Sequence, residues 1–265
     1  YYVGGQKPTT MIPTDCSVLR TPTIPQGLSP TYEQTHVVLG LLTLVSLYNH
    51  NTDRMEYLIM AFDGITISNI VNDLNNTILG GRLYKIAQPE SDELLLTVKT
   101  SSGQYRVVLS ANASLPLAYI TDDNKPSPAT APNFVMLLRK HINNGRIISV
   151  TQPSLERIID IEIEHLDELG DLCKRHLITE FMGKHSNIIL CDDDNNILDS
   201  IKHVSAQISS VREVLPGRKY FIPNTANKHN PLDTDYERFS SSVLVCPKPL
   251  SKALCQTYTE ISTCI

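Results

Sequence analysis

Short strand-like patterns separated by turn residues recur from residue 82 onward, and they constrain the fold more than any other feature of the sequence. The run at 157–165 shows the pattern well, because Ile159, Ile161 and Ile163 alternate with polar residues as in a half-buried strand. Similar runs predict further strands at residues 82–86, 93–99, 104–110, 117–121, 146–150, 172–182, 186–191 and 197–203. Short turns join several of them, so the predicted pairing is antiparallel.

Two helices are predicted among these strands. Residues 67–78 place apolar side chains at i, i+3, i+4, i+7 and i+11, with Thr66 or Ser68 as a cap at the start. Residues 134–145 carry a second apolar stripe, and their final Asn-Gly pair supplies left-handed residues that end a helix. Helices at defined points among antiparallel strands predict an α+β fold, a mostly antiparallel β-sandwich-like domain with flanking helices, rather than a parallel α/β fold.

The composition limits the classes of partner. Hydrophobic residues make up 41% of the 265-residue chain, which suits a globular protein with one large or two small domains. The formal net charge of −5 excludes a generally basic nucleic-acid binder, so any contact with RNA requires a local patch. No apolar run is long enough to span a membrane. The six cysteines lack the spacing of a zinc site, which predicts free thiols in a reducing cytosol and no bound metal.

Residues 1–59 differ in composition from the rest of the chain. They hold much of the Pro and Thr, and their apolar run at 37–48 lacks the flanking basic segment and cleavage site of a secretory signal. The codons permitted for residues 54–56 include a purine-rich ribosome-binding sequence shortly before Met60. We therefore interpret residues 1–59 as a non-native or disordered extension read in frame from upstream DNA. The other predicted divisions are a domain at 60–223, a polar linker at 224–235 and the truncated start of a second domain at 236–265.

Basic residues gather at two points of the predicted domain. Arg139, Lys140 and His141 share one turn of the second predicted helix, and Lys184 and His185 follow a predicted strand. All five are candidates for RNA contacts. The alternative is a solvated basic face, or pairing with local carboxylates. The sequence has no GxSxG, HExxH or P-loop motif, so a catalytic function is the weaker interpretation.

Six short strings occur in the order in which one protein family has them. They are AFDG at 61–64, GGRLYKIAQP at 80–89, MLLRKHI at 136–142, LERI at 155–158, FMGKHSNIIL at 181–190 and VLPG at 214–217. Together they make the chain from residue 60 onward resemble the N-terminal domain of the NFACT family. Bacterial members of this family are RqcH-type ribosome quality-control factors, formerly labelled fibronectin-binding protein A. The end of the chain resembles the start of the family's helix-hairpin-helix region.

The resemblance implies a non-catalytic domain that binds tRNA and the large ribosomal subunit carrying peptidyl-tRNA. Proteins of this type recruit alanyl-tRNA, so that the ribosome adds untemplated alanine tails to stalled nascent chains. The expected location is therefore the cytoplasm, on ribosomes, with no cofactor and no DNA or membrane partner. A fibronectin-binding surface adhesin, as the older label suggests, is the alternative interpretation.

The family's tRNA-engaging dipeptide, usually Asp-Arg, matches Glu156 and Arg157. The planar fork of an arginine suits a phosphate or a base edge, and a neighbouring carboxylate can orient it. Without the resemblance, the pair is typical of a surface ion pair worth under about 1 kcal/mol. The family has Gly-Ile-Ser at 260–262, where this chain has Glu-Ile-Ser. The fold of this family's N-terminal domain is expected to resemble the N-terminal domain of formamidopyrimidine-DNA glycosylases. In this chain, however, residues 60–62 lack the proline nucleophile of those enzymes.

Overall fold

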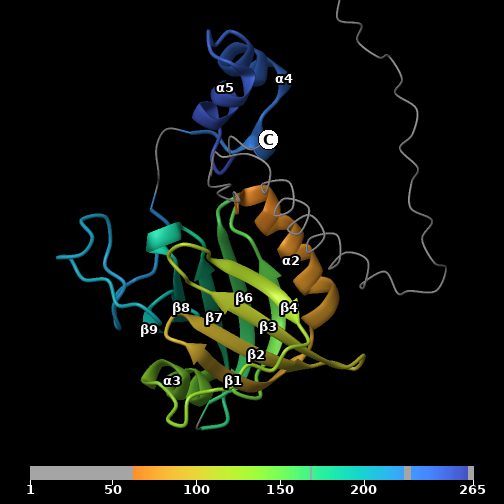
Figure 1. Ribbon diagram of the computed structural model, residues 1–265, viewed down its shortest axis with the longest axis vertical. Helices are drawn as coiled ribbons and strands as arrows, with labels where there is room; N and C mark the ends of the chain where they lie inside the picture. Colours follow the sequence, from red (N-terminus) through yellow and green to blue (C-terminus); the bar gives the residue numbers. More distant parts are fainter. Residues whose placement is uncertain (1–61, 168, 224–227, 262–265) are drawn as a thin grey trace, which may run out of the picture. The chain divides into compact units, whose positions relative to one another are not determined.

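The computed structural model of the protein describes residues 62–167, 169–223 and 228–261 (Figure 1). The predicted extension at 1–59 and the predicted start at Met60 lie outside these described residues, as does part of the predicted linker, at 224–227. The helices and strands discussed below all belong to the described ranges.

Nine strands of the described residues form one antiparallel sheet in the order β4-β3-β2-β1-β5-β6-β7-β8-β9. Their bounds are β1 Arg82–Glu90, β2 Glu93–Lys99, β3 Gln104–Ser110, β4 Leu117–Thr121, β5 Arg146–Thr151, β6 Ile158–Leu166, β7 Leu172–Glu180, β8 Asn187–Asp192 and β9 Ile197–Ser200. The predicted strands are confirmed, and β2, β3 and β4 have the predicted bounds. β1 continues four residues beyond its predicted end at Ile86, through an irregular stretch of pairing that accommodates Pro89.

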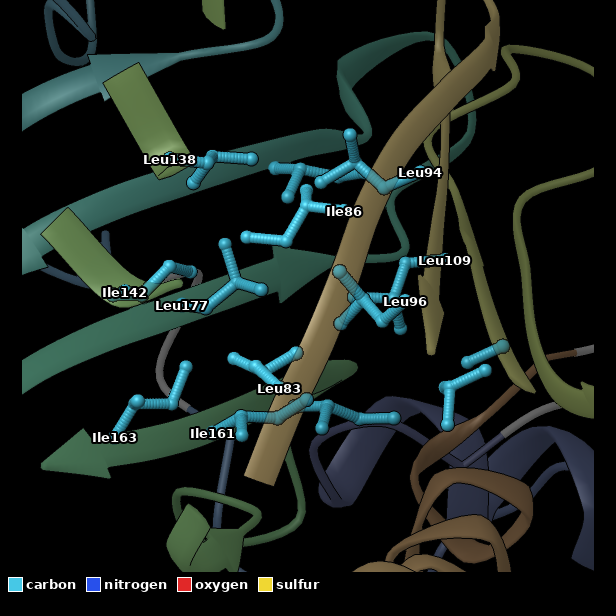
Figure 2. Packing of buried hydrophobic residues seen from close by; sticks show 14 of the residues in the cluster. Leu83, Ile86, Leu94, Leu96, Leu109, Leu138, Ile142, Ile161, Ile163 and Leu177 are labelled. Atoms are coloured by element: carbon cyan, nitrogen blue, oxygen red, sulfur yellow. The ribbon is translucent and has the colours of Figure 1, made fainter. Parts of the chain in front are cut away.

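The sheet encloses its own core because its two halves face each other. Figure 1 shows β1–β4 crossing over β6–β8, and Figure 2 shows the side chains between them. Leu83 and Leu96 of the first half share a fully buried cluster with Ile161 and Leu177 of the second half. The predicted sandwich-like α+β fold is thus confirmed, and its two layers are halves of one continuous sheet, joined where β1 pairs with β5. The likeness to formamidopyrimidine-DNA glycosylases stays a prediction.

The first predicted helix is α2, Gly64–Ile78, which packs against β4, β5 and β6. Its N-cap is Asp63, and the prediction of Thr66 or Ser68 as the cap was wrong. The Asp63 carboxylate accepts hydrogen bonds from both the backbone N–H and the hydroxyl of Thr66, each at 3.0 Å. The helix therefore begins one turn earlier than its apolar pattern indicates, because an aspartate outside that pattern satisfies its first N–H groups.

The second predicted helix is α3, Asn133–Ile142, which closes one side of the core with Leu138 and Ile142 (Figure 2). Asn144 has the predicted left-handed backbone, with φ of 60°. Gly145 does not, and it is required for another reason. A Cβ at Gly145 would lie 2.6 Å from Cγ2 of Ile163, so only glycine lets this turn approach β6.

The C-terminal segment forms a small separate cluster. It contains η3 Pro231–Asp233, α4 Tyr236–Phe239, the π-helix η4 Ser240–Leu244 and α5 Leu250–Thr257. Val243, Ala253 and Tyr258 are its buried centre. The backbone of His229 pairs with Thr257 and Thr259 at 2.9 and 3.0 Å, which ties the beginning of the segment to its end. The assignment of this segment to a helix-hairpin-helix region stays a prediction.

Candidate functional site

The loop at 152–157, between β5 and β6, carries Glu156 and Arg157. The side-chain amide of Gln152 donates to the carbonyls of Gly64 and Glu156, each at 2.8 Å, and so links this loop to the start of α2. Leu155 is buried, and the carbonyl of Arg157 accepts a hydrogen bond of 2.9 Å from the N–H of Phe181. The backbone at Glu156 and Arg157 is therefore held by groups other than their two side chains.

Residues 62–64, the described part of the AFDG string, lie against this loop. A Cβ at Gly64 would lie 2.1 Å from the carbonyl oxygen of Leu155, closer than any real contact, so the position needs glycine. Asp63 caps α2, and the ring of Phe62 packs against the buried ring of Phe181 with centroids 5.2 Å apart. Each residue of the string from Phe62 to Gly64 thus has a structural reason for its identity.

Glu260 closes the site from the C-terminal segment. Its carboxylate forms an ion pair with Nε of Arg157, and its carbonyl accepts a hydrogen bond of 3.1 Å from the N–H of Gly64. The pairing with Arg157 rests on charge and proximity, because Nε of Arg157 makes no hydrogen bond within the described part of the chain. The Arg157 side chain is 37% exposed, so solvent and ligands can still reach it.

The three charges at this site are interdependent. Burial raises the pKa of the Glu156 carboxyl above its ordinary value, the Glu260 carboxylate raises this pKa further, and Arg157 opposes both effects. The guanidinium thus interacts with two carboxylates, Glu260 as its ion-pair partner and Glu156 through charge alone. Such a guanidinium can exchange a carboxylate for a phosphate, because each anion offers two oxygens that accept hydrogen bonds from the two arms of the guanidinium.

The backbone of Glu260 leads to a testable difference between two variants. Its φ is 53°, a left-handed conformation that disfavours any residue with a Cβ. We expect the free energy of unfolding of Glu260→Gly to be about 1 kcal/mol higher than that of Glu260→Ala. This difference is what remains after the greater entropy of glycine in the unfolded chain is subtracted from the relief of backbone strain. Both variants lose the ion pair with Arg157, so urea denaturation of the two isolates the backbone term. Equal stabilities would contradict a left-handed backbone at this position.

The structure brings only some of the other predicted residues to this site. Lys184 and His185 are exposed in η2, Gly183–His185, which follows the end of β7 and so lies at the same end of the sheet as Arg157. The helix that carries the other three candidates, Arg139, Lys140 and His141, lies elsewhere. The turn that follows this helix approaches β6 where Gly145 meets Ile163, five residues along β6 from the strand's first residue.

Arg139 also has a structural task. Its Nη2 and Nε donate to the carbonyl of Ile86 at 2.8 and 3.2 Å, which fastens α3 to β1. The residues around Glu156 and Arg157 that sequence reasoning missed are Gln152, Phe181 and Glu260. None of them stands in a local pattern that indicates a site, and only the fold brings them together.

Metal and thiol chemistry have no visible site in the ranges described. There, no group of three or more His, Cys, Asp or Glu side chains is arranged to hold a metal ion. Cys173, Cys191, Cys246 and Cys255 are free, and burial raises the pKa of the Cys191 thiol to about 12. Among the helices described, none has the length and apolar character needed to cross a membrane.

Comparison with known protein families and curated proteins gives a consistent match. A family model described as NFACT N-terminal and middle domains matches residues 63–265. The Rqc2 homolog RqcH of Bacillus subtilis is 39% identical over 175 residues, which are 66% of this chain and 31% of that protein. The ribosome quality control complex subunit NEMF of Homo sapiens is 24% identical over 187 residues, which are 71% of this chain and 16% of that protein. The chain thus spans about a third or less of the length of these relatives.

Solved structures share the fold. The N-terminal domain of fibronectin-binding protein PavA from Streptococcus pneumoniae matches with a TM-score of 0.71 and 33% identity, over 76% of each chain. The fibrinogen-binding protein from Staphylococcus aureus matches with a TM-score of 0.67 and 31% identity, over 76% of this chain and 71% of that one. At these identities the likeness extends to the sequence as well as to the fold.

Proposed function

Because this chain belongs to the NFACT family, we propose that it is the tRNA- and large-subunit-binding domain of a cytoplasmic ribosome quality-control factor. Relatives named Rqc2 homolog RqcH and ribosome quality control complex subunit NEMF support this role. In the proposed reaction, the protein recruits alanyl-tRNA to a large subunit that still carries peptidyl-tRNA. The ribosome forms the peptide bonds of the alanine tail, so the domain positions tRNA and contributes no catalytic residue.

The observation that carries this proposal is the arrangement of Arg157. Its backbone is fixed by Phe181, whereas its side chain remains partly exposed and, within the described ranges, forms an ion pair with one carboxylate, that of Glu260. A tRNA phosphate or base edge would take over the place of Glu260 on the guanidinium. Glu156 would keep the guanidinium oriented, and Lys184 and His185, at the same end of the sheet, would contact the RNA backbone nearby.

Removal of the dipeptide's side chains tests the proposal. We expect Glu156→Ala with Arg157→Ala to change the free energy of unfolding by no more than about 1 kcal/mol. The backbone contacts of the loop remain, and the double change removes the carboxylate that repels Glu260 together with the partly exposed arginine that attracts it. The same variant should bind alanine tRNA about ten- to a hundredfold more weakly, since a lost charge-assisted contact costs roughly 1.5–3 kcal/mol. Fluorescence anisotropy with labelled tRNA measures the affinity, and urea denaturation measures the stability.

A matched control is available on the neighbouring strands. Glu162 and Lys174 form a partly exposed ion pair of 2.8 Å across β6 and β7, so Glu162→Ala with Lys174→Ala removes the same kinds of charge away from the site. This control should bind tRNA as the unmodified protein does. Unchanged tRNA binding by the folded Glu156 and Arg157 variant would refute the assignment, and loss of its cooperative unfolding would indicate a structural role for the pair.

One further measurement distinguishes the adhesin alternative from the proposed tRNA-binding function. The solved relatives described as fibronectin- and fibrinogen-binding proteins make immobilised fibronectin the relevant probe. If the proposed function is right, tRNA binding should depend on Arg157, and any fibronectin binding should not depend on it. Fibronectin binding that is lost with Arg157, together with absent tRNA binding, would favour the adhesin.

A further inference from the structure

A row of cationic side chains crosses three adjacent strands on the outer side of the sheet. Lys99 of β2 lies directly opposite Arg82 of β1, and Arg82 lies directly opposite Arg146 of β5. All three are exposed, while the next residue along β1 and along β5, and the preceding residue of β2, are fully buried. The alternation places the three cations on the face that points away from the core.

A second row runs beside the first. Lys85 of β1 lies opposite Thr97 of β2, which lies opposite Arg106 of β3. Five cationic side chains therefore occupy two neighbouring rows, and we refer to them together as the cationic face. Its members are Arg82, Lys85, Lys99, Arg106 and Arg146.

The pairing of Arg82 with Arg146 is unusually close for like charges. The N–H of Leu83 bonds the carbonyl of Gly145, and the N–H of Ile147 bonds the carbonyl of Gly81, each at 2.9 Å. These bonds flank Arg82 and Arg146, so the two arginines form a non-hydrogen-bonded pair, in which opposed Cα atoms are only about 4.5 Å apart. Like charges directly opposite each other destabilise a sheet, and the contact therefore needs a reason other than folding.

Carboxylates do not neutralise this face within the described residues. Arg82 donates to the carbonyl of Asn144 at 3.1 Å and Arg106 to the carbonyl of Asp122 at 3.0 Å, and neither bond removes charge. In the described ranges, none of the five cations lies within ion-pair distance of an Asp or Glu side chain. On β6, Glu162 pairs with Lys174 and Asp160 with His176, and Glu164 lies opposite Arg146 without forming an ion pair with it among the described residues.

The cationic face also presents an ordered aromatic ring. Nζ of Lys99 lies 3.3 Å from the centroid of the Tyr84 ring, which is 53% exposed. This cation–π contact holds both groups at the surface. The opposite end of the same face is covered, since Glu93 pairs with Lys125 at 2.7 Å and Leu95 and Val108 are buried beside it. The open end is thus the cationic one, beside the tip of the β2–β3 hairpin (Figure 1).

We propose that the cationic face binds the phosphate backbone of a structured RNA, as a contact surface separate from Glu156 and Arg157. Arginine forks, a surface lysine and an exposed ring together match the phosphates and riboses of RNA better than they match an acidic peptide. In the strand register, Arg146 lies opposite Glu164 of β6, which is seven residues from Arg157, so the two surfaces lie roughly 23 Å apart along the strand. The identity of the polyanion as RNA rests on the proposed function.

The test removes three charges from the cationic face. The variant Arg82→Gln, Lys99→Gln, Arg146→Gln is compared with Arg218→Gln, Lys219→Gln, Lys228→Gln, which removes three exposed charges elsewhere. Of these control residues, Arg218 has a carboxylate partner, Glu213 at 2.9 Å. The probe is an unmodified, fluorescein-labelled tRNA transcript, and anisotropy gives its Kd over a range of salt concentrations.

The cationic-face variant should raise the Kd by at least about tenfold, and the slope of log K against log salt should fall by roughly two to three. The control variant should stay within about twofold of the unmodified protein. The thermal midpoint of the cationic-face variant should be unchanged or higher, because like-charge repulsion is removed. The variant Arg82→Lys, Arg146→Lys keeps the charges and should retain most of the salt dependence.

Three outcomes would overturn the proposal. They are an unchanged Kd and salt slope in the cationic-face variant, a lowered midpoint that the lysine variant does not restore, or, with labelled poly-glutamate as a second probe, a cationic-face variant that loses binding of this acidic peptide but keeps tRNA binding. The proposed function fails separately, if Glu156→Ala with Arg157→Ala leaves tRNA binding unchanged. The prediction for the cationic-face variant can therefore fail while that for the Glu156 and Arg157 variant holds, and the reverse.

Discussion

Replacing Glu180 with alanine is expected to lower the free energy of unfolding by about 3–5 kcal/mol, because it leaves a buried charge without its partner. Glu180 ends β7 and has no exposed surface. Its carboxylate accepts hydrogen bonds from Nη2 of Arg212 and, at 3.0 Å, from the hydroxyl of Tyr220. The Arg212 side chain is only 11% exposed, so water cannot take over the role of the missing carboxylate.

The surrounding groups show how strongly this pair is coupled. Burial lowers the pKa of Arg212, but the hydrogen bond and the charge of Glu180 raise it by more. Burial also raises the pKa of the Tyr220 hydroxyl, and the Glu180 carboxylate adds to this effect. Arg212 further donates to the carbonyl of Phe221 at 2.8 Å, so the loss of Glu180 should loosen the chain between these two residues.

Urea denaturation followed by circular dichroism measures this effect. Glu162→Ala is the matched control, because it removes a partly exposed carboxylate from the adjacent strand and should cost under about 1 kcal/mol. The double variant Glu180→Ala, Arg212→Ala should cost less than the sum of the single variants, since it leaves neither charge stranded. A cost below about 1 kcal/mol for Glu180→Ala would show that the carboxylate is not buried as described.

The second large effect is expected from Gly64→Ala. The added Cβ would lie 2.1 Å from the carbonyl oxygen of Leu155 and 2.6 Å from Cγ of Leu155. A backbone oxygen cannot move aside as the end of a flexible side chain can. The loop at 152–157 must therefore separate from α2. We expect a loss of about 3 kcal/mol, at the upper end of the cost of overpacking.

This substitution should also impair the candidate site without touching a charged residue. The displaced loop carries Glu156 and Arg157, and Gln152 would lose its 2.8 Å bond to the carbonyl of Gly64. The expected result is weak tRNA binding under conditions in which the protein remains folded. Gly217→Ala is the control, since Gly217 has φ of 81° and no heavy atom within 4 Å of the added Cβ.

The control should cost about 1–2 kcal/mol through its left-handed backbone and should leave tRNA binding intact. A Gly64→Ala protein with the stability and the tRNA affinity of the unmodified chain would mean that α2 and the loop do not approach as closely as described. Thermal unfolding and tRNA anisotropy on the same samples give both quantities.

Local sequence patterns predicted the elements well where each element is defined by its own residues. The bounds of β2, β3 and β4 follow from short strand-like runs and from the turn residues between them, both of which are local properties. The end of β1 was missed because its pairing with β2 continues past an irregularity at Pro89, which depends on the partner strand. The cap of α2 was missed because Asp63, whose extended backbone lets its side chain accept from the N–H of Thr66, stands outside the apolar pattern.

The candidate site shows the same division. The family resemblance placed Glu156 and Arg157, and no periodicity or spacing would have singled them out. The partners Gly64, Gln152 and Glu260 come from the start, the middle and the end of the described chain. Their approach to one another depends on how α2, the 152–157 loop and the C-terminal segment pack, which is not written in any one stretch.

By itself, the sequence determined which residues form strands and helices, which face of each is apolar, and the family to which the chain belongs. Only the tertiary structure decided which strands pair and in which register, and hence that Lys99, Arg82 and Arg146 stand in one row. The physical reason is one of range. The burial of one face of a strand imposes a period on consecutive residues, whereas strand pairing depends on hydrogen bonds and packing between segments far apart in the chain.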